Sequence, residues 1–204
     1  MTSTCWNCSA AVSTRFCAVC KALQPPARDF YEFFDVPRQL ALDPKDLEKR
    51  FYALSRQLHP DLFSRKPARE QEYALEASAV LNDAYRALKD PITRALYLLK
   101  QEGFEIAEQG TKDVPPELLE EVFELNMALE ELRSGDDEAR AQLESARHRF
   151  EGMRDQIDAQ MREKFVGWDN DHERAKLDEI RGLLNRRKYI TNLIARTDEA
   201  HVSD

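Results

Sequence analysis

The sequence predicts an all-α protein, and three observations support that class. Glycine is scarce, with 6 in 204 residues, and Ala, Leu, Glu, Arg and Lys dominate a chain in which 33% of residues are charged. That composition is typical of helical proteins. Apolar residues recur at helical spacing along most of the chain. Asp43-Pro44 is a helix start, with Asp as the cap and Pro at the first helical position, and Asp90-Pro91 starts a new unit.

Composition also excludes several classes of function. The net charge of -8 and the pI of about 5.2 disfavour a general nucleic-acid binder, which would show a basic field. No apolar run approaches the roughly 20 residues of a membrane span, so we expect no membrane partner. The N-terminus shows neither a secretion signal nor an Arg-rich presequence. We expect a cytoplasmic bacterial protein, or a mitochondrial matrix protein if the chain is a processed eukaryotic product.

The first element is a metal-binding segment over residues 1–26. It holds all four cysteines of the chain, as two C-x2-C pairs separated by eight residues: Cys5, Cys8, Cys17 and Cys20. Such pairs can place four thiolates around one structural zinc ion, and metal binding would supply most of the folding energy of so short a segment. Disulfides are disfavoured without a secretion signal, and iron in an all-thiolate site is the other alternative. Four Cys ligands leave no open position for catalysis.

The role of this segment stays open from sequence. It could serve dimerisation, stability or redox sensing, so a homodimer is allowed. Trp6 and Phe16 are expected to pack around the knuckle that the four cysteines form, and Gln24-Pro25-Pro26 is interpreted as a short stiff linker.

The next domain is expected over residues 29–100, and within it residues 29 to 89 are expected to form a helical hairpin with a small extra helix. A short aromatic helix is expected over Asp29 to Val36. The helix after Asp43-Pro44 has one apolar face, made by Leu47, Phe51, Leu54 and Leu58. A basic stripe lies nearly opposite, two residues out of phase: Lys45, Lys49, Tyr52 and Arg56. The stripe is either an ordinary solvated face or a docking surface for an acidic partner.

His59-Pro60-Asp61 ends that helix. Proline cannot extend a helix and biases the residue before it away from helical geometry. On its own the tripeptide favours a helix stop with Asp capping the next turn. A second amphipathic helix follows over Ala68 to Lys89, and its Ala-rich contacts allow a close antiparallel pair, with the tripeptide at the bend.

Residues 101–204 are expected to form a C-terminal three-helix bundle. The predicted helices run from about Glu117 to Arg133, Asp137 to Phe165 and Asp171 to Arg196. Gly167-Trp168-Asp169 is interpreted as a break between the last two, and Thr197 to Asp204 as a frayed end.

The first bundle helix carries more apolar residues than one core face requires. Leu119, Phe123 and Met127 form a second stripe about 100° from the core stripe, flanked by Glu120, Glu124 and Glu131. This stripe is either a protein-binding surface rimmed with carboxylates or part of a wide buried face.

Three motifs resemble a J-domain. They are Phe30-Tyr31-Glu32-Phe33-Phe34, the run from Arg50 through His59-Pro60-Asp61 to Phe63, and the run from Ala79 to Pro91. Arg94-Ala95-Leu96-Tyr97-Leu98-Leu99 with Gly103-Phe104 is similar to the HscB type, a co-chaperone of iron–sulfur cluster biogenesis. The resemblance covers roughly residues 29 to 196. The tetracysteine start resembles the longer form of that family.

The resemblance implies a mechanism without catalysis by this chain. A J-domain docks on a DnaK/HscA-type ATPase chaperone through its second helix, and the His-Pro-Asp turn stimulates ATP hydrolysis. The residues implied are Lys45, Lys49, Arg50 and Arg56 for docking, and His59, Pro60 and Asp61 for stimulation. The C-terminal bundle of the family holds an IscU-type iron–sulfur scaffold protein. The residues implied for that contact are Leu119, Phe123, Glu124, Met127 and Glu131.

The chain departs from the family pattern at three positions. The family often has Met and Glu where Glu120 and Met127 stand, and an aromatic where Asn185 stands. Three other functions are alternatives. A general J-domain co-chaperone for unfolded clients is the main alternative, a zinc-ribbon nucleic-acid binder is opposed by the acidic pI, and a metal-dependent enzyme lacks the open ligand position it needs.

Overall fold

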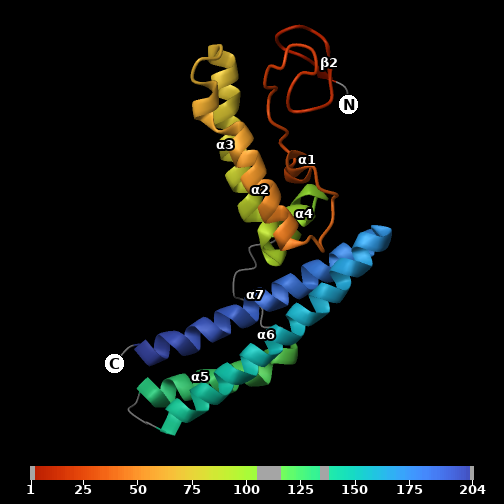
Figure 1. The fold of residues 1–204 in the computed structure, drawn as a ribbon. Coiled ribbons are helices and arrows are strands. Elements are labelled where there is room, and N and C mark those ends of the chain that lie inside the picture. The colour runs from red at the N-terminus through yellow and green to blue at the C-terminus, as the bar shows by residue number, and fades with distance from the viewer. Residues whose placement is uncertain (1–2, 105–115, 134–137, 203–204) are drawn as a thin grey trace. The chain divides into compact units, whose positions relative to one another are not determined.

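The computed structural model describes residues 3–104, 116–133 and 138–202, and it confirms the all-α class. The chain divides into two compact units, Met1–Leu98 and Leu99–Asp204, which Figure 1 shows. The described residues include no helix that is both long and apolar enough to cross a membrane.

The first unit begins with a small knuckle over residues 3–24, which holds the four cysteines. Two short strands, β1 (Ser3–Thr4) and β2 (Ala11–Val12), pair antiparallel. The sequence did not predict them, because a strand of two residues leaves no period-2 pattern to detect. Gln24 is 6% exposed and donates to the carbonyl of Ala22, so it is part of the knuckle rather than of a linker.

Four helices complete the first unit: α1 (Phe30–Phe34), α2 (Pro44–Leu58), α3 (Ala68–Lys89) and the start of α4 (Pro91–Gln101). Asp29 and Asp43 cap α1 and α2 with their side chains, as the sequence indicated for Asp43. The helices α2 and α3 form the predicted hairpin. The buried residues of the hairpin are large on α2 and both small and large on α3. They are Leu47, Leu54 and Leu58 on α2, and Ala74, Ala77, Leu81, Ala84 and Leu88 on α3.

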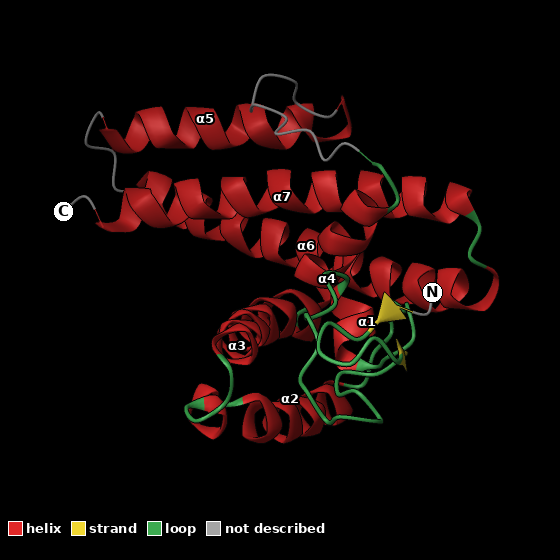
Figure 2. Cartoon of the chain, turned by 90° about the horizontal axis from the view of Figure 1, so that it is seen from above, coloured by secondary structure: helices red, strands yellow, loops and turns green. Residues whose placement is uncertain are grey.

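The second unit is a bundle of α5 (Leu119–Arg133), α6 (Glu138–Asp171) and α7 (Arg174–Val202). A short 3-10 turn, η2 (Pro116–Leu118), leads into α5. The helix α5 lies beside the first half of α6 and the last half of α7, as Figures 1 and 2 show. An ion pair from Glu124 to Arg149 and a hydrogen bond from Arg196 to Asn126 join these segments.

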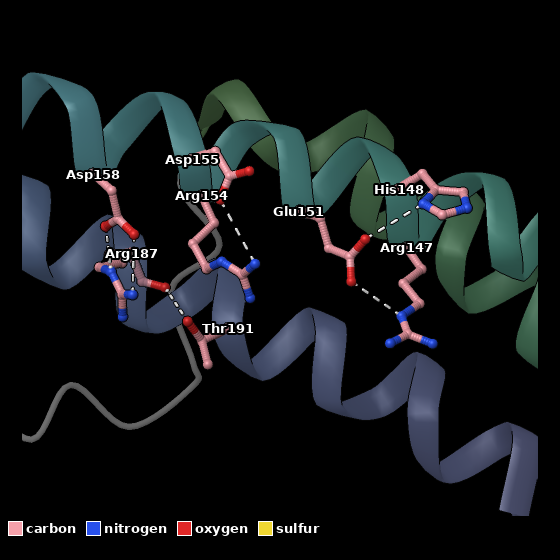
Figure 3. Close-up of polar contacts among 8 residues, drawn as sticks. All are labelled: Arg147, His148, Glu151, Arg154, Asp155, Asp158, Arg187 and Thr191. Carbon is pink, nitrogen blue, oxygen red and sulfur yellow. Dashed lines mark hydrogen bonds and ion pairs between the residues drawn. The ribbon is translucent and has the colours of Figure 1, made fainter.

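Ion pairs on the outside of α6 and α7 add to the apolar core (Figure 3). Arg187 donates to both carboxylate oxygens of Asp158, at 2.6 and 3.2 Å, and so fixes α7 against α6. Arg147 contacts Glu151 on its own helix and Asp198 on α7.

Two helix ends predicted from sequence were wrong. The helix α6 continues through Gly167 to Asp171, because Trp168 is buried and its packing outweighs the roughly 1 kcal/mol that glycine costs in a helix. The turn comes at His172, which adopts a left-handed φ of 55°. At the other end, α7 runs on to Val202, and Thr197 is fully buried rather than frayed.

Candidate functional site

The described residues offer three candidate sites, the first of which is the cysteine cluster. The Sγ atoms of Cys5, Cys8, Cys17 and Cys20 all lie within 4.8 Å of one another, so the four residues could bind a metal ion. The Sγ atoms of Cys5 and Cys20 are 3.6 Å apart, and so are those of Cys8 and Cys17.

Each cysteine pair lies in a backbone turn, and the two turns, twelve residues apart in sequence, have the same geometry. The N–H of Cys5 donates to Ala10 and that of Cys17 donates to Ala22, at 2.8 and 3.0 Å. Ser9 and Lys21, each following the second cysteine of its pair, both adopt left-handed backbone, with φ of 60° and 62°. Two equivalent turns facing one another direct four thiols to a common point, as a tetrahedral ion requires.

The thiol chemistry of the cluster fits a cation. Burial raises the pKa of Cys5, but hydrogen bonds from the N–H groups of Asn7 and Cys8 outweigh it and bring that pKa down to about 6. Gln24 Nε2 also donates to Cys5 Sγ at 3.4 Å. An N–H of Ala10 lowers the pKa of Cys8, yet burial and the neighbouring thiols prevail and raise it to about 12. Four thiolates this close repel one another, and a divalent cation removes that repulsion.

The second site is the tip of the hairpin. His59 follows the last residue of α2, and Pro60 begins a 3-10 turn, η1 (Pro60–Phe63). His59 Nδ1 accepts a hydrogen bond from the N–H of Asp61 at 3.3 Å and lies 3.5 Å from a carboxylate oxygen of Asp61. Both side chains are exposed, at 56% and 89%. The tripeptide is therefore a turn that presents a histidine and an aspartate to solvent.

Contacts from the loop itself and from α3 hold the tip in place. Phe63 is buried, and Gln71 of α3 donates to the carbonyls of Ser64 and Lys66 at 3.3 and 2.8 Å. Sequence analysis did not find Gln71, because a polar residue on an exposed helix position carries no distinguishing pattern.

The basic face of α2 leads to this tip. Lys45, Lys49, Tyr52 and Arg56 are all exposed, as the stripe predicted. Arg50 differs, since its guanidinium donates to Asp46 at 2.8 Å and to the carbonyls of Asp35 and Phe34 at 3.0 and 3.5 Å. Arg50 therefore fastens the end of α1 to α2.

The third site is the outer face of α5. Leu119, Phe123 and Met127 are 56%, 64% and 48% exposed, which decides between the two interpretations of the second stripe in favour of an exposed apolar patch. Glu120 and Glu124 are exposed beside it, and Glu131 is half-buried. Leu119, Phe123 and Met127, with the three glutamates beside them, are called the α5 patch below.

A groove of about 510 Å3 adjoins the α5 patch between α5 and α6. It is lined by Glu124, Met127, Ala128, Glu131, Ala141, Gln142, Ser145, Ala146 and Arg149. Four of these residues are small, and Glu124 and Arg149 form an ion pair of 2.8 Å with one another. Three residues predicted from the α5 sequence pattern therefore share one hollow with residues of α6 that the pattern could not identify.

Comparisons with known proteins match both units. Residues 29–97 match the DnaJ domain, and residues 114–198 match the HSCB C-terminal oligomerisation domain. The iron-sulfur cluster co-chaperone protein HscB of Mus musculus is 33% identical over 196 residues, which cover 93% of this chain and 79% of the relative. The Homo sapiens protein of the same name is 31% identical over 196 residues, 93% of this chain and 78% of the relative.

Solved structures agree. The crystal structure of human co-chaperone protein HscB matches with a TM-score of 0.68 and 28% identity, over 98% of this chain and 99% of that one. The chaperone HscB from Vibrio cholerae matches with a TM-score of 0.60 and 28% identity, over 85% and 97%. With a J-domain, a matching C-terminal domain and relatives aligned over most of their length, this chain belongs to the HscB family of iron–sulfur cluster co-chaperones.

Proposed function

We propose that this chain stimulates the ATPase of a DnaK/HscA-type chaperone and delivers an IscU-type iron–sulfur scaffold to it. The observation that carries the first half is the exposed His59-Pro60-Asp61 turn at the end of the basic face of α2. Lys45, Lys49 and Arg56 steer an acidic surface of the ATPase onto α2, and the turn then meets it. His59 and Asp61 act by contact and take no part in the hydrolytic chemistry themselves.

The substitution His59→Gln tests this half. The variant removes the imidazole from an exposed position, so the fold should be unchanged and ATPase stimulation should fall to the basal rate. A steady-state ATPase assay with the purified partner chaperone measures it, and circular dichroism checks the fold. Full stimulation by His59→Gln would refute the proposal.

The second half rests on the α5 patch. Phe123 is a large aromatic side chain, mostly exposed, beside exposed carboxylates, and aromatic residues and Met are enriched in protein interfaces. We propose that Leu119, Phe123 and Met127 bury against an apolar patch of the scaffold, while Glu124 and Glu131 meet basic groups around it.

The substitution Phe123→Ala tests this contact. It should weaken scaffold binding by about 2 kcal/mol, roughly 30-fold, because a hot-spot aromatic is lost. Val166→Ala on α6 is the matched control, since Val166 is also an exposed apolar residue, at 52%. A binding titration with purified scaffold decides it. Unchanged binding by Phe123→Ala would favour a general J-domain co-chaperone for unfolded clients.

We propose zinc as the ion of the cysteine cluster, because four thiolates around a tetrahedral point suit a closed structural zinc site. The ion would hold the knuckle together and leave no position for substrate. Metal analysis of the purified protein should give one zinc per chain, and visible absorption would reveal iron instead.

A further inference from the structure

The first turns of α3 contact both the knuckle and the loop that carries the His-Pro-Asp turn. Glu70 Oε1 accepts a hydrogen bond from the N–H of Leu23 in the knuckle, at 3.3 Å. The next residue, Gln71, holds the loop that carries the His-Pro-Asp turn through the carbonyls of Ser64 and Lys66. Because successive helical residues point about 100° apart, one turn of α3 contacts the knuckle on one side and this loop on the other.

The knuckle grips α3 through a second group of contacts. Trp6 lies between Cys5 and Cys8 and meets the ring of Tyr73 edge-on, with centroids 6.1 Å apart. The guanidinium of Arg69 lies over both rings, at 5.2 Å from Trp6 and 5.7 Å from Tyr73, and donates to the Tyr73 hydroxyl. In Figure 1 the knuckle accordingly stands beside the half of α3 that follows the loop.

Every knuckle group in these contacts is tied to the cysteine cluster. Trp6 Nε1 donates to the carbonyl of Leu23 at 2.7 Å, and the following residue, Gln24, donates to Cys5 Sγ. The buried apolar cluster of the knuckle consists of Val12 and two of the cysteines, packed with Ala10 and Cys20. Such a core is too small to fold alone, so the position of Leu23 depends on metal.

Glu70 makes this dependence costly for α3. It is 5% exposed, and a buried carboxylate is stable only with its hydrogen-bond donors in place. If the knuckle unfolds, the Leu23 N–H is lost and the first turns of α3 must rearrange to hydrate Glu70. The anchor of the loop at Gln71 lies in the same turn.

We infer that metal binding at the four cysteines orders the His-Pro-Asp loop through α3, and that Glu70 is a positioning residue in this coupling. The metal-loaded knuckle fixes Glu70, and the turn containing Glu70 and Gln71 fixes residues 59–67. The linkage is reciprocal, so a metal that orders the loop is itself bound more tightly when the loop is ordered, and loss of the Glu70 contact should weaken metal binding. The coupling rests on the proposed metal site, and its consequence for ATPase stimulation rests on the proposed co-chaperone function.

The test compares three variants of the full-length chain. Glu70→Leu removes the acceptor, Glu70→Gln keeps an Oε1 acceptor of the same length, and Glu72→Leu alters an exposed neighbour on the same helix. Zinc affinity is measured by competition with a chromophoric chelator. Glu70→Leu should bind zinc about tenfold more weakly, within the usual range of coupling between sites, while the other two bind like the wild type.

Hydrogen exchange gives a readout independent of affinity and activity. Removing zinc from the wild type should speed amide exchange over residues 59–73 and leave residues 81–89 unchanged. In Glu70→Leu, zinc should protect residues 59–73 less. If Glu70→Leu does not fold, Trp6→Ala replaces it, because it removes the second grip of the knuckle without altering the J-domain sequence.

Two results would overturn the inference: wild-type zinc affinity in the folded Glu70→Leu or Trp6→Ala variant, or exchange over residues 59–73 that ignores zinc. Zinc-free wild type should also stimulate the ATPase less than zinc-loaded wild type. A chain that couples zinc to the loop but never stimulates an ATPase would refute the proposed function alone. A chain that stimulates equally with and without zinc, and shows no linkage, would refute this inference alone.

Discussion

The exposed faces of α2 and α5 are built for opposite kinds of contact. The face of α2 carries Lys45, Lys49 and Arg56, and its charges lie on a helix whose apolar side chains face inward. The face of α5 carries Phe123 and its two apolar neighbours in the open, among glutamates. Charged surfaces mainly accelerate encounter and fix orientation, whereas a desolvated aromatic supplies affinity.

This difference fits the two proposed partners, whose complexes with this chain would have different lifetimes. A contact dominated by exposed charge forms and breaks quickly, as a trigger for another protein's ATPase should. A contact dominated by apolar burial dissociates slowly, as retention of a cargo requires. Under the proposed function, the opposite signs of charge would also discourage each partner from occupying the other's face.

The largest test of the comparison is complementation between two defective chains. His59→Gln should still bind the scaffold but not stimulate the ATPase. Phe123→Ala should still stimulate the ATPase but bind the scaffold weakly. If delivery requires both faces on one chain, an equimolar mixture should show little of the scaffold-dependent ATPase stimulation of the wild type, because each complex lacks one contact.

The measurement is ATPase rate at scaffold concentrations below saturation of the Phe123→Ala variant. A chain carrying both substitutions, mixed with wild type, controls for dilution. Recovery of the wild-type rate by the two single variants would show that trigger and cargo contact act independently in solution.

Charge reversal on α2 should have a smaller, salt-dependent effect. Lys49→Glu should slow association with the ATPase chaperone roughly tenfold at low ionic strength, and the deficit should shrink as salt screens the charges over about 10 Å at 0.1 M. Association kinetics at two salt concentrations measure it.

Arg86→Glu provides the control for this prediction. Arg86 is an exposed cation on α3, and its change in charge is the same. An equal loss of association rate with Arg86→Glu would mean that net charge, rather than the basic face of α2, steers the encounter. Scaffold binding should be nearly unaffected by either variant and should depend little on salt.

Sequence patterns predicted most of this architecture because the two hairpin helices and the bundle helices repeat apolar residues at regular spacing. They failed at Trp168 and Thr197, where burial of a single residue extends a helix beyond its sequence signals. The sites divide similarly. The exposed turn and the α5 patch are local in sequence and could be predicted, whereas Glu70 meets Leu23 across 47 residues.

Glu70 nevertheless left a trace in the sequence. It lies in phase with Ala74, Ala77 and Leu81, at the position of a core residue. A carboxylate at an apolar phase of a helix indicates a buried polar contact. The sequence could therefore have flagged the residue, but its partner belongs to a segment without helical periodicity and was visible only in the fold.

The smallest effect is expected at Arg50, and it separates docking from folding on α2. Arg50→Ala removes partly exposed hydrogen bonds to Asp46 and to the carbonyls at the end of α1, so the free energy of unfolding should fall by about 1 kcal/mol. Lys49→Ala should leave stability unchanged, because Lys49 is exposed and its proposed role is docking rather than folding. Denaturant unfolding measures both, and Arg50→Lys should recover little, since an ammonium cannot reproduce the guanidinium fork that reaches α1 and Asp46 together. If Arg50→Ala instead keeps wild-type stability and slows association with the chaperone as much as Lys49→Glu, Arg50 belongs to the docking face, and that face is wider than its exposed lysines.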